Sequence, residues 1–263
     1  MLGISASTGY PIPLEFRFPM LKKAGFDSII LGWDNSEMAT RVDRVWLAKA
    51  FDLKIEHAHA TYRDMNALWL PGSDGNRTAL RLLREIADCA EFGIETLVLH
   101  LTNGSTPPPV SSAGLERLQY LVRLAEDSGV KLAFENTHST EHPKAVLSAF
   151  ESPYVGLCFD SGHAHLWTPD TDWLHLFGDR LFAVHLHDNL ADSDTHLLPM
   201  DGSINWDGVM QKLSAASYSG SLTLEVDLHG CPIYDNLGIE VFLNTAFERG
   251  CVLNTMLQKY REK

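Results

Sequence analysis

Eight short runs of apolar and β-branched residues alternate along this chain with longer segments in which apolar residues recur every three or four positions. The short runs are typical of buried strands, and the longer segments are typical of amphipathic helices. The expected strands are Leu2–Ser7, Ser28–Trp33, Lys54–Thr61, Glu95–Thr102, Lys131–His138, Tyr154–Asp160, Leu181–Asp188 and Ser221–Asp227. Strict alternation of strands and helices indicates parallel pairing with right-handed crossovers.

Two α/β architectures satisfy this alternation: a closed barrel and an open, doubly wound sheet. Eight units favour closure, and no G-x-G-x-x-G sequence follows the first expected strand, where a dinucleotide-binding sheet would carry one. A (β/α)8 barrel uses about 250 residues as one unit, which fits a chain of 263 residues. We therefore predict a single barrel domain over residues 1–263. A C-terminal helical tail is expected from Ile233 to Lys263, and long loops are expected at P-G-S-D-G and N-G-S-T-P-P-P-V.

Composition narrows the functional classes. Apolar residues make up 45% and charged residues 21% of the chain, as in soluble proteins with a large core. The first residues lack a basic stretch followed by an apolar one, and no segment approaches about 18 consecutive apolar residues. A cytoplasmic protein without membrane contact is therefore expected. The net charge of −13 disfavours nonspecific binding of nucleic acid, because such binding depends on lysine and arginine.

Nearly every expected strand ends in or near a histidine or a carboxylate. In a barrel the carboxyl ends of all strands face one rim, so such residues can surround a single pocket. The residues concerned are His59, His100, Glu135, Asp160, His163, His185, Asp194, His196 and Glu225. Imidazoles and carboxylates that converge from separate strands are the usual ligands of divalent metal ions. The sequence therefore predicts a metal site at the rim, with proton-transfer chemistry beside it.

Some of these residues have a purely structural alternative. A single histidine in an apolar strand is more often a hydrogen-bonded core residue than a ligand, so one member of the pair His57 and His59 is expected to be structural. A carboxylate at the end of a buried parallel strand is costly without a partner. That cost favours a functional role for Glu135 and Glu225.

Motifs on the later strands carry a family resemblance. E-N-T lies at the end of the fifth expected strand, F-D-S-G-H at the sixth and H-L-H-D-N at the seventh, followed by D-T-H-L-L-P-x-D-G-x-I-x-W and E-V-D. This set resembles the xylose isomerase-like TIM barrel superfamily. More narrowly, it is similar to the sugar phosphate isomerase/epimerase branch, which is related to endonuclease IV-type AP endonucleases. The resemblance spans residues 2–227 and implies the fold more firmly than the substrate.

In the ketose 3-epimerase members of this superfamily, two glutamates, an aspartate and a histidine hold one Mn²⁺ or similar ion. By resemblance, the ligands of Mn²⁺, Co²⁺ or Mg²⁺ in this chain are Glu135, Asp160, His185 and Glu225. The resemblance further implies an isomerase or epimerase that works through an enediolate, with Glu135 and Glu225 as base and acid and His163 placing a substrate oxygen. One departure is Ala191, which stands where those epimerases carry an arginine.

Two other functional classes remain open. The nuclease members use a larger ligand set for a multinuclear Zn²⁺ centre, and this chain matches that set at every rim position named above. Cleavage of phosphodiesters is therefore the alternative function, although the acidic balance and the lack of a basic, DNA-gripping loop disfavour it. A binding or scaffold barrel without enzymatic activity is disfavoured by the number of acids and imidazoles retained.

The expected partner is a small sugar or sugar phosphate, within carbohydrate metabolism. Trp33 and Trp167 can offer apolar faces to the C–H groups of a sugar. Arg63, just beyond the third expected strand, could meet a phosphate or a carboxylate. The sequence leaves open which sugar is bound and whether the chain forms a homo-oligomer.

Overall fold

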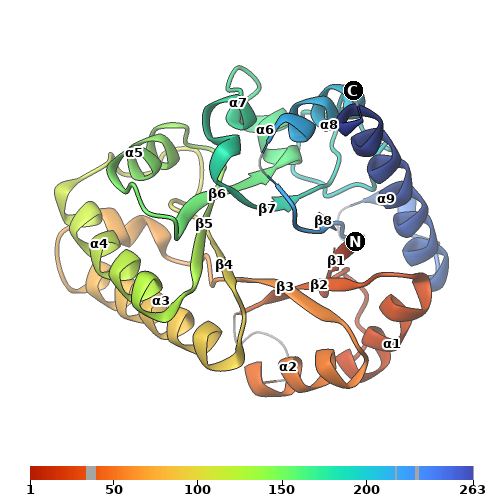
Figure 1. Cartoon of the computed structure of the whole chain (residues 1–263), viewed down its shortest axis with the longest axis horizontal. Coiled ribbons are helices and arrows are strands. Elements are labelled where there is room, and N and C mark those ends of the chain that lie inside the picture. The colour runs from red at the N-terminus through yellow and green to blue at the C-terminus, as the bar shows by residue number, and fades with distance from the viewer. Residues whose placement is uncertain (34–39, 217, 229–230, 263) are drawn as a thin grey trace.

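The computed structural model describes residues 1–33, 40–216, 218–228 and 231–262. Its described strands form one parallel sheet in the order β7-β6-β5-β4-β3-β2-β1-β8. The strands are β1 (Leu2–Ser5), β2 (Ser28–Gly32), β3 (Lys54–His59), β4 (Thr96–Leu99), β5 (Lys131–Glu135), β6 (Val155–Asp160), β7 (Leu181–His185) and β8 (Leu222–Leu224). A parallel bridge between Leu186 and Leu224 joins the two ends of the order and closes the ring. The predicted (β/α)8 barrel is confirmed (Figure 1).

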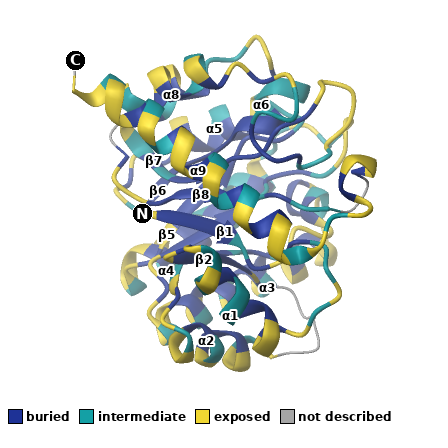
Figure 2. Cartoon of the chain, turned by 90° about the vertical axis from the view of Figure 1, so that its right-hand side faces the viewer, coloured by how far each residue is buried: buried dark blue, intermediate teal, exposed yellow. Residues whose placement is uncertain are grey.

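Helices surround the ring of strands (Figure 1). They are α1 (Leu14–Ala24), α2 (Arg41–Ala50), α3 (Ser73–Phe92), α4 (Ser112–Ser128), α5 (Glu141–Ala149), α6 (Ser161–Trp167), α7 (Trp173–Phe177), α8 (Trp206–Ala215) and α9 (Ile239–Arg261). Short 3-10 helices lie at η1 (Met65–Trp69), η2 (Gly178–Arg180) and η3 (Pro232–Tyr234). Figure 2 shows buried strands inside and exposed residues on the outer faces of the helices. No helix in the described ranges combines the length and the apolar character needed to cross a membrane.

Local sequence sets the ends of several helices. Thr40 begins α2 with a reciprocal pair of hydrogen bonds to Asp43, which satisfies free backbone N–H groups at the start of a helix. Helices α3 and α4 end at Gly93 and Gly129, which adopt positive φ angles that glycine enters without a side-chain clash. These signals explain why the helical segments stop where their apolar periodicity stops.

The expected C-terminal tail is part of the barrel wall. Helix α9 packs against α8 and α1, so it fills the place between these two helices (Figure 1). Phe242, Leu243 and Ala246 lie on its buried face. Lys263, the last residue of the expected tail, lies outside the described residues.

Two loop expectations had different outcomes. Residues 103–110, N-G-S-T-P-P-P-V, contain no helix or strand, as predicted. The expected P-G-S-D-G loop is partly wrong, because α3 begins at Ser73 and takes in its last three residues. A side chain at Gly75 would overlap the carbonyl oxygen of Ala67 and the guanidinium of Arg117. That glycine therefore serves the close packing of a helix, whereas the sequence suggested a turn.

Small residues line the inside of the ring below the mouth. Val98, Ala133, Cys158 and Ala183, one from each of β4 to β7, form a separate buried cluster. Side chains two positions apart on a strand point to the same face. The residues that follow at this spacing are His100, Glu135, Asp160 and His185. The fold therefore stacks polar rim residues on a layer of small interior ones.

Candidate metal centre

The ends of β5 to β8 bring four predicted ligands together. Glu135, Asp160 and His185 are the last residues of β5, β6 and β7, and Glu225 directly follows β8. Asp160 is paired with His185 across the β6–β7 ladder. Glu225 is partly exposed, and the other three are buried. One ligand atom from each of the four lies within 4.8 Å of the others. We call these four residues the first group.

Two buried atoms of the first group fit a bound cation. His185 Nδ1 lies 3.0 Å from Glu225 Oε2 and 3.4 Å from Glu135 Oε1. Neither His185 Nδ1 nor Glu135 Oε1 makes a hydrogen bond of good geometry to a described residue, although His163 Nδ1 also lies 3.1 Å from Glu135 Oε1. Buried polar atoms without partners are rare because they are costly. A divalent ion would satisfy both atoms, and carboxylate and imidazole donors suit such an ion.

The surrounding histidines keep the glutamates of the first group charged. Burial alone would raise the pKa of Glu135, but the adjacent His185 and His100 outweigh burial and hold that pKa well below its ordinary value. Burial also opposes ionisation of Glu225, and His185 again outweighs it, so the pKa of Glu225 is lowered. Both carboxylates are therefore ionised at neutral pH, which gives the site the negative charge that attracts a cation.

His57 lies behind His185, on the side away from the glutamates. The two Nε2 atoms are 2.9 Å apart, and both rings are buried. Burial, helped by the nearby His185, holds the pKa of His57 well below its ordinary value, so His57 is neutral. The contact engages Nε2 of His185 and leaves its Nδ1 facing the carboxylates, as partners behind metal-binding histidines commonly do.

His59 and His100 approach the other oxygen of Glu135. Their Nε2 atoms lie 3.2 Å and 3.1 Å from Glu135 Oε2. His59 Nδ1 donates to the carbonyl of Ala60 at 2.9 Å, so its Nε2 is the nitrogen left to face the carboxylate. Ligand atoms of His59, Glu135 and His185 also lie within 4.8 Å of one another. Glu135 is thus shared between the histidines of the early strands and the first group.

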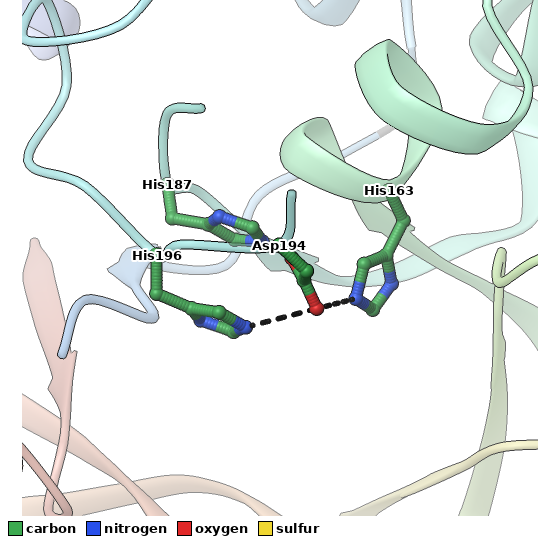
Figure 3. Close-up of side chains that lie close together, drawn as sticks. All are labelled: His163, His187, Asp194 and His196. Atoms are coloured by element: carbon green, nitrogen blue, oxygen red, sulfur yellow. Dashed lines mark ion pairs between the residues drawn. The ribbon is translucent and has the colours of Figure 1, made fainter. Parts of the chain in front are cut away.

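A second group of possible ligands surrounds Asp194 (Figure 3). Its members, whose ligand atoms lie within 4.8 Å of one another, are His163, His187, Asp194 and His196. Asp194 Oδ2 lies 3.4 Å from His163 Nε2 and 3.4 Å from His196 Nε2. His163 Nδ1 donates to the carbonyl of Asn136 at 3.0 Å, which leaves Nε2 to face Asp194. Three predicted rim residues therefore meet beside the first group.

His187 is the member of the second group that the sequence analysis did not select. Its Nε2 lies 3.0 Å from Asp160 Oδ1, and its ring stacks on His196 with centroids 3.9 Å apart. A side chain at Gly162 would overlap the His187 ring, so glycine makes room for it. The alternation of the seventh strand contained the signal, because residues 185 and 187 point to one face. His187 links the aspartate of the first group to the second group.

A buried carboxylate anchors the loop between β7 and α8, which carries Asp194 and His196. Asp188 accepts hydrogen bonds from the backbone N–H groups of Met200 and Ile204 at 2.9 Å and 3.0 Å. It also accepts one from the indole of Trp206 at 2.7 Å. Because these donors come from the far end of the loop, Asp188 ties that end to the strand.

His196 is held in an unfavourable backbone conformation. Its φ angle is 48°, in the left-handed region that costs energy for a residue with a Cβ atom. Its Nδ1 donates to the carbonyl of Glu225 at 2.7 Å, which directs Nε2 toward Asp194. Burial would lower the pKa of His196, but Asp194 outweighs burial and raises it to about 9. Strain held in this way is common at functional sites.

The predicted substrate-binding residues lie in different surroundings. Trp167 stacks on His163 with centroids 4.4 Å apart and lines the cavity of the first group. Arg63 lines an adjoining cavity over β1, β2, β3 and β8. Trp33 also borders that adjoining cavity, but its ring is fully buried and its indole donates to Asp88 at 3.3 Å. Only a small part of Trp33 is therefore available to a ligand.

Known proteins with similar sequences or structures support the fold. Over 84 residues the chain is 40% identical to protein y4fM of Sinorhizobium fredii, a match that covers 32% of this chain and 27% of that protein. A further curated relative is matched over 62% of its length. The chain thus spans less than two thirds of each.

Two solved structures are similar over nearly the whole chain. A D-tagatose 3-epimerase-like protein has 20% identity and a TM-score of 0.76, with 99% of this chain and 98% of that chain covered. The IolI protein, solved with a binding zinc atom, has 18% identity and a TM-score of 0.73, with 98% of each chain covered. Residues 18–240 match the model of the family described as xylose isomerase-like TIM barrel. The chain therefore belongs to the xylose isomerase-like TIM barrel family, as the sequence motifs predicted.

Proposed function

We propose that this chain is a divalent-metal-dependent isomerase or epimerase of sugars. The observation that carries the proposal is the convergence of Glu135, Asp160, His185 and Glu225, in which buried Glu135 Oε1 and His185 Nδ1 lack hydrogen-bond partners among the described residues. One similar solved structure, named for a sugar 3-epimerase, supports the substrate class, and another, solved with zinc, supports a divalent metal. The open-chain form of a ketose is the proposed substrate.

The residues of the chain have defined tasks in this proposal. A divalent ion in the first group would polarise neighbouring carbonyl and hydroxyl oxygens of the sugar. Of Glu135 and Glu225, both ionised in the free site, one would remove a proton from carbon to give an enediolate. The other, after taking up a proton from solvent, would return it to the opposite face, and the first would release its proton to solvent. His163 would place a substrate oxygen, and Trp167, stacked on it, would offer an apolar face.

Exchange of the substrate's carbon-bound hydrogen with solvent tests the acid–base assignment. Ketoses are incubated with metal-loaded protein in D₂O, and deuterium at C3 is followed by NMR. Glu135→Gln and Glu225→Gln should each lower the exchange rate by about 10²–10⁴-fold. Glu151→Gln is the matched control, since Glu151 is an exposed carboxylate before β6 at the opposite end of the barrel. Near-normal exchange in either rim variant would overturn the assignment.

A multinuclear Zn²⁺ phosphodiesterase is the second candidate function. The observation that favours it is the second group, whose ligand atoms also lie within 4.8 Å of one another. Clustered metals can activate water and stabilise a leaving oxygen. Against this candidate, Arg63 is the one lysine or arginine among the described residues that line the two mouth cavities. A nucleic acid backbone would normally meet several such cations.

Metal content separates the two candidates. Purified protein is loaded with Mn²⁺ or Zn²⁺, dialysed, and analysed by mass spectrometry for bound metal per chain. About one ion, with Mn²⁺, Co²⁺ or Mg²⁺ supporting exchange, favours the isomerase or epimerase. Two or more tightly held Zn²⁺ ions, together with hydrolysis of a phosphodiester, would favour the phosphodiesterase.

A further inference from the structure

The mouth of the barrel contains two joined cavities. The cavity of the first group, which we call the metal lobe, has a volume of about 340 Å³ and is bordered by Glu135 and Trp167. The other, which we call the side lobe, has about 470 Å³ and is bordered by Ser5, Ser7 and Asp227. Both are lined by His59, Tyr62, Asp194, His196 and Glu225. The lobes are therefore neighbouring parts of one cleft.

The metal lobe is large enough to hold a sugar by itself. Its volume falls within the range of about 300–1,000 Å³ that is typical of small-molecule sites. Glu135 and His163 border the metal lobe but not the side lobe. Because the side lobe is the larger of the two and lies away from Glu135, it has room for a part of the substrate that does not react.

Tyr62 stands at the junction of the lobes. Its ring centroid lies 6.1 Å from that of His59 and 5.3 Å from that of His100. The side chain is about half exposed, so one side of the ring packs on the histidines while the other is open to the cleft. An aromatic ring in this position can contact the C–H faces of a ligand that passes from one lobe to the other.

The side lobe suits hydroxyl groups better than anions. Ser5 and Ser7 bring hydroxyl groups, and Asp227, which belongs to neither group of ligands, brings oxygens that accept from sugar hydroxyls. Asp194 and Glu225 add negative charge to the same wall. Arg63 is the single described lysine or arginine along its wall. The three acids oppose a phosphate, since like charges nearby oppose its binding, whereas a neutral hydroxylated group meets no such repulsion. His59 and His196 are the other basic side chains on this wall.

We propose that the side lobe holds a neutral, hydroxylated second unit joined to the reacting sugar. The preferred substrate class is then a ketose that carries a glycosyl unit, as opposed to a free or a phosphorylated ketose. The reaction at the ketose end rests on the proposed function. Binding of a ligand in the side lobe can be tested from dissociation constants even when no reaction is seen.

Three ligands with the same ketose end separate these classes. D-Fructose has a free O6, D-fructose 6-phosphate has a phosphate there, and isomaltulose has a glucosyl unit there. Dissociation constants are measured with Mn²⁺-loaded protein by calorimetry or ligand-observed NMR. Isomaltulose should bind at least about 10-fold more tightly than fructose, and fructose 6-phosphate should bind no more tightly than fructose. Equal or undetectable affinity for isomaltulose overturns the proposal, and so does tightest binding of the phosphate.

A substitution in the side lobe tests whether the preference arises there. Ser7 is exposed, so Ser7→Trp should fold, and bound Mn²⁺ per chain reports on the fold. The indole would fill the side lobe, and the ratio of fructose to isomaltulose dissociation constants should fall from about 10 to about one. Ser219→Trp, at an exposed serine before β8, is the matched control and should keep the ratio. A preference that survives Ser7→Trp contradicts the proposal.

Failure of the proposed function has a different signature. One outcome is that none of the three sugars exchanges deuterium, while the isomaltulose preference and its loss in Ser7→Trp are observed. Binding of a second unit in the side lobe is then supported, and the proposed isomerase or epimerase reaction is wrong. If fructose exchanges deuterium but isomaltulose binds no more tightly than fructose, the proposed reaction is supported and the proposed role of the side lobe is wrong.

Discussion

At the residue scale, the position of His57 behind His185 leads to a first prediction. His57→Phe keeps an aromatic ring but removes the nitrogen that lies 2.9 Å from His185 Nε2. Without that contact, His185 is free to turn its Nδ1 away from Glu135 and Glu225. Partners of this kind are worth about 10–100-fold in metal affinity. We therefore expect the dissociation constant for Mn²⁺, measured by calorimetric titration, to rise by about 10–100-fold.

His165→Phe is the matched control for this substitution. His165 bonds Ser203 Oγ at 2.9 Å and lies outside both groups of ligands, so its loss should leave Mn²⁺ affinity as it is. If His57→Phe also binds Mn²⁺ with unchanged affinity, His57 is a core residue with no part in the metal site.

Residue types and spacing predicted most members of the two groups, but they did not predict which contacts each histidine makes. His57 and His59 share one face of β3, and the sequence alone could not separate their roles. Depth along the strand decides between them: His59 ends the strand and reaches Glu135, whereas His57 lies two residues deeper and reaches His185. His187 was not selected although the expected strand Leu181–Asp188 placed it on the face of His185, because alternation does not show that its ring reaches Asp160 and His196.

At the element scale, the loop between β7 and α8 depends on one carboxylate. Asp188→Asn exchanges an acceptor oxygen for an amide, which cannot accept from all of the N–H groups of Met200, Ile204 and Trp206. Hydrogen bonds to a buried charged group are worth about 1.5–3 kcal/mol each. We expect the free energy of unfolding, from urea titration, to fall by about 2–3 kcal/mol.

The same substitution should act on the second group more than on the first. Asp194 and His196 lie on the anchored loop, whereas Glu135 and Asp160 end strands. If loading with Zn²⁺ places an ion at the second group, that ion should be lost from Asp188→Asn while the first group keeps its own. Asp192→Asn, at an exposed position of the same loop, should change neither property. Equal loss at both groups would show that Asp188 supports the whole rim and not this loop in particular.

The elements themselves were largely predictable, and the exceptions have physical causes. All eight expected runs contain a strand, because most buried parallel strands read as nearly continuous apolar runs; β3, K-I-E-H-A-H, is more polar than the others. The sequence did not predict a bulge in β3. Ile29 pairs with Ile55 and Ile30 pairs with His57, so Glu56 is the extra residue. Bulges re-aim a side chain by breaking alternation, and a one-residue insertion leaves no mark in a hydrophobic pattern.

At the scale of the whole molecule, the bulge residue Glu56 belongs to the end of the barrel opposite the candidate metal groups. Glu56 Oε1 accepts from the backbone N–H of Ser221, and Oε2 accepts from its hydroxyl, each at 2.9 Å. Ser221 directly precedes β8, so the carboxylate joins β3 to β8 at the end opposite the metal groups. Residues at that end of such barrels serve stability, while those at the carboxyl ends of strands serve chemistry.

Glu56→Gln should therefore lower stability without changing metal affinity. The amide retains one acceptor oxygen and loses the charge, and we expect the free energy of unfolding at about pH 7 to fall by about 1–2 kcal/mol. Glu91→Gln, at an exposed position on α3, is the control for loss of one negative charge. Urea titration measures the difference, and Mn²⁺ titration checks that the mouth is intact.

The pH dependence of this difference follows from the pKa of Glu56. Burial alone would raise that pKa, but the hydrogen bonds from Ser221, with help from Lys54, outweigh burial and lower it below its ordinary value of 4.5. A group whose pKa is lower in the folded state stabilises fully above the unfolded pKa, and the contribution disappears as pH falls through the folded value. The stability gap between the wild type and Glu56→Gln should thus be constant from neutral pH down to about pH 5 and shrink below the ordinary pKa of 4.5. If the difference in free energy of unfolding between the wild type and Glu56→Gln grew in acid, Glu56 would instead be protonated in the folded protein.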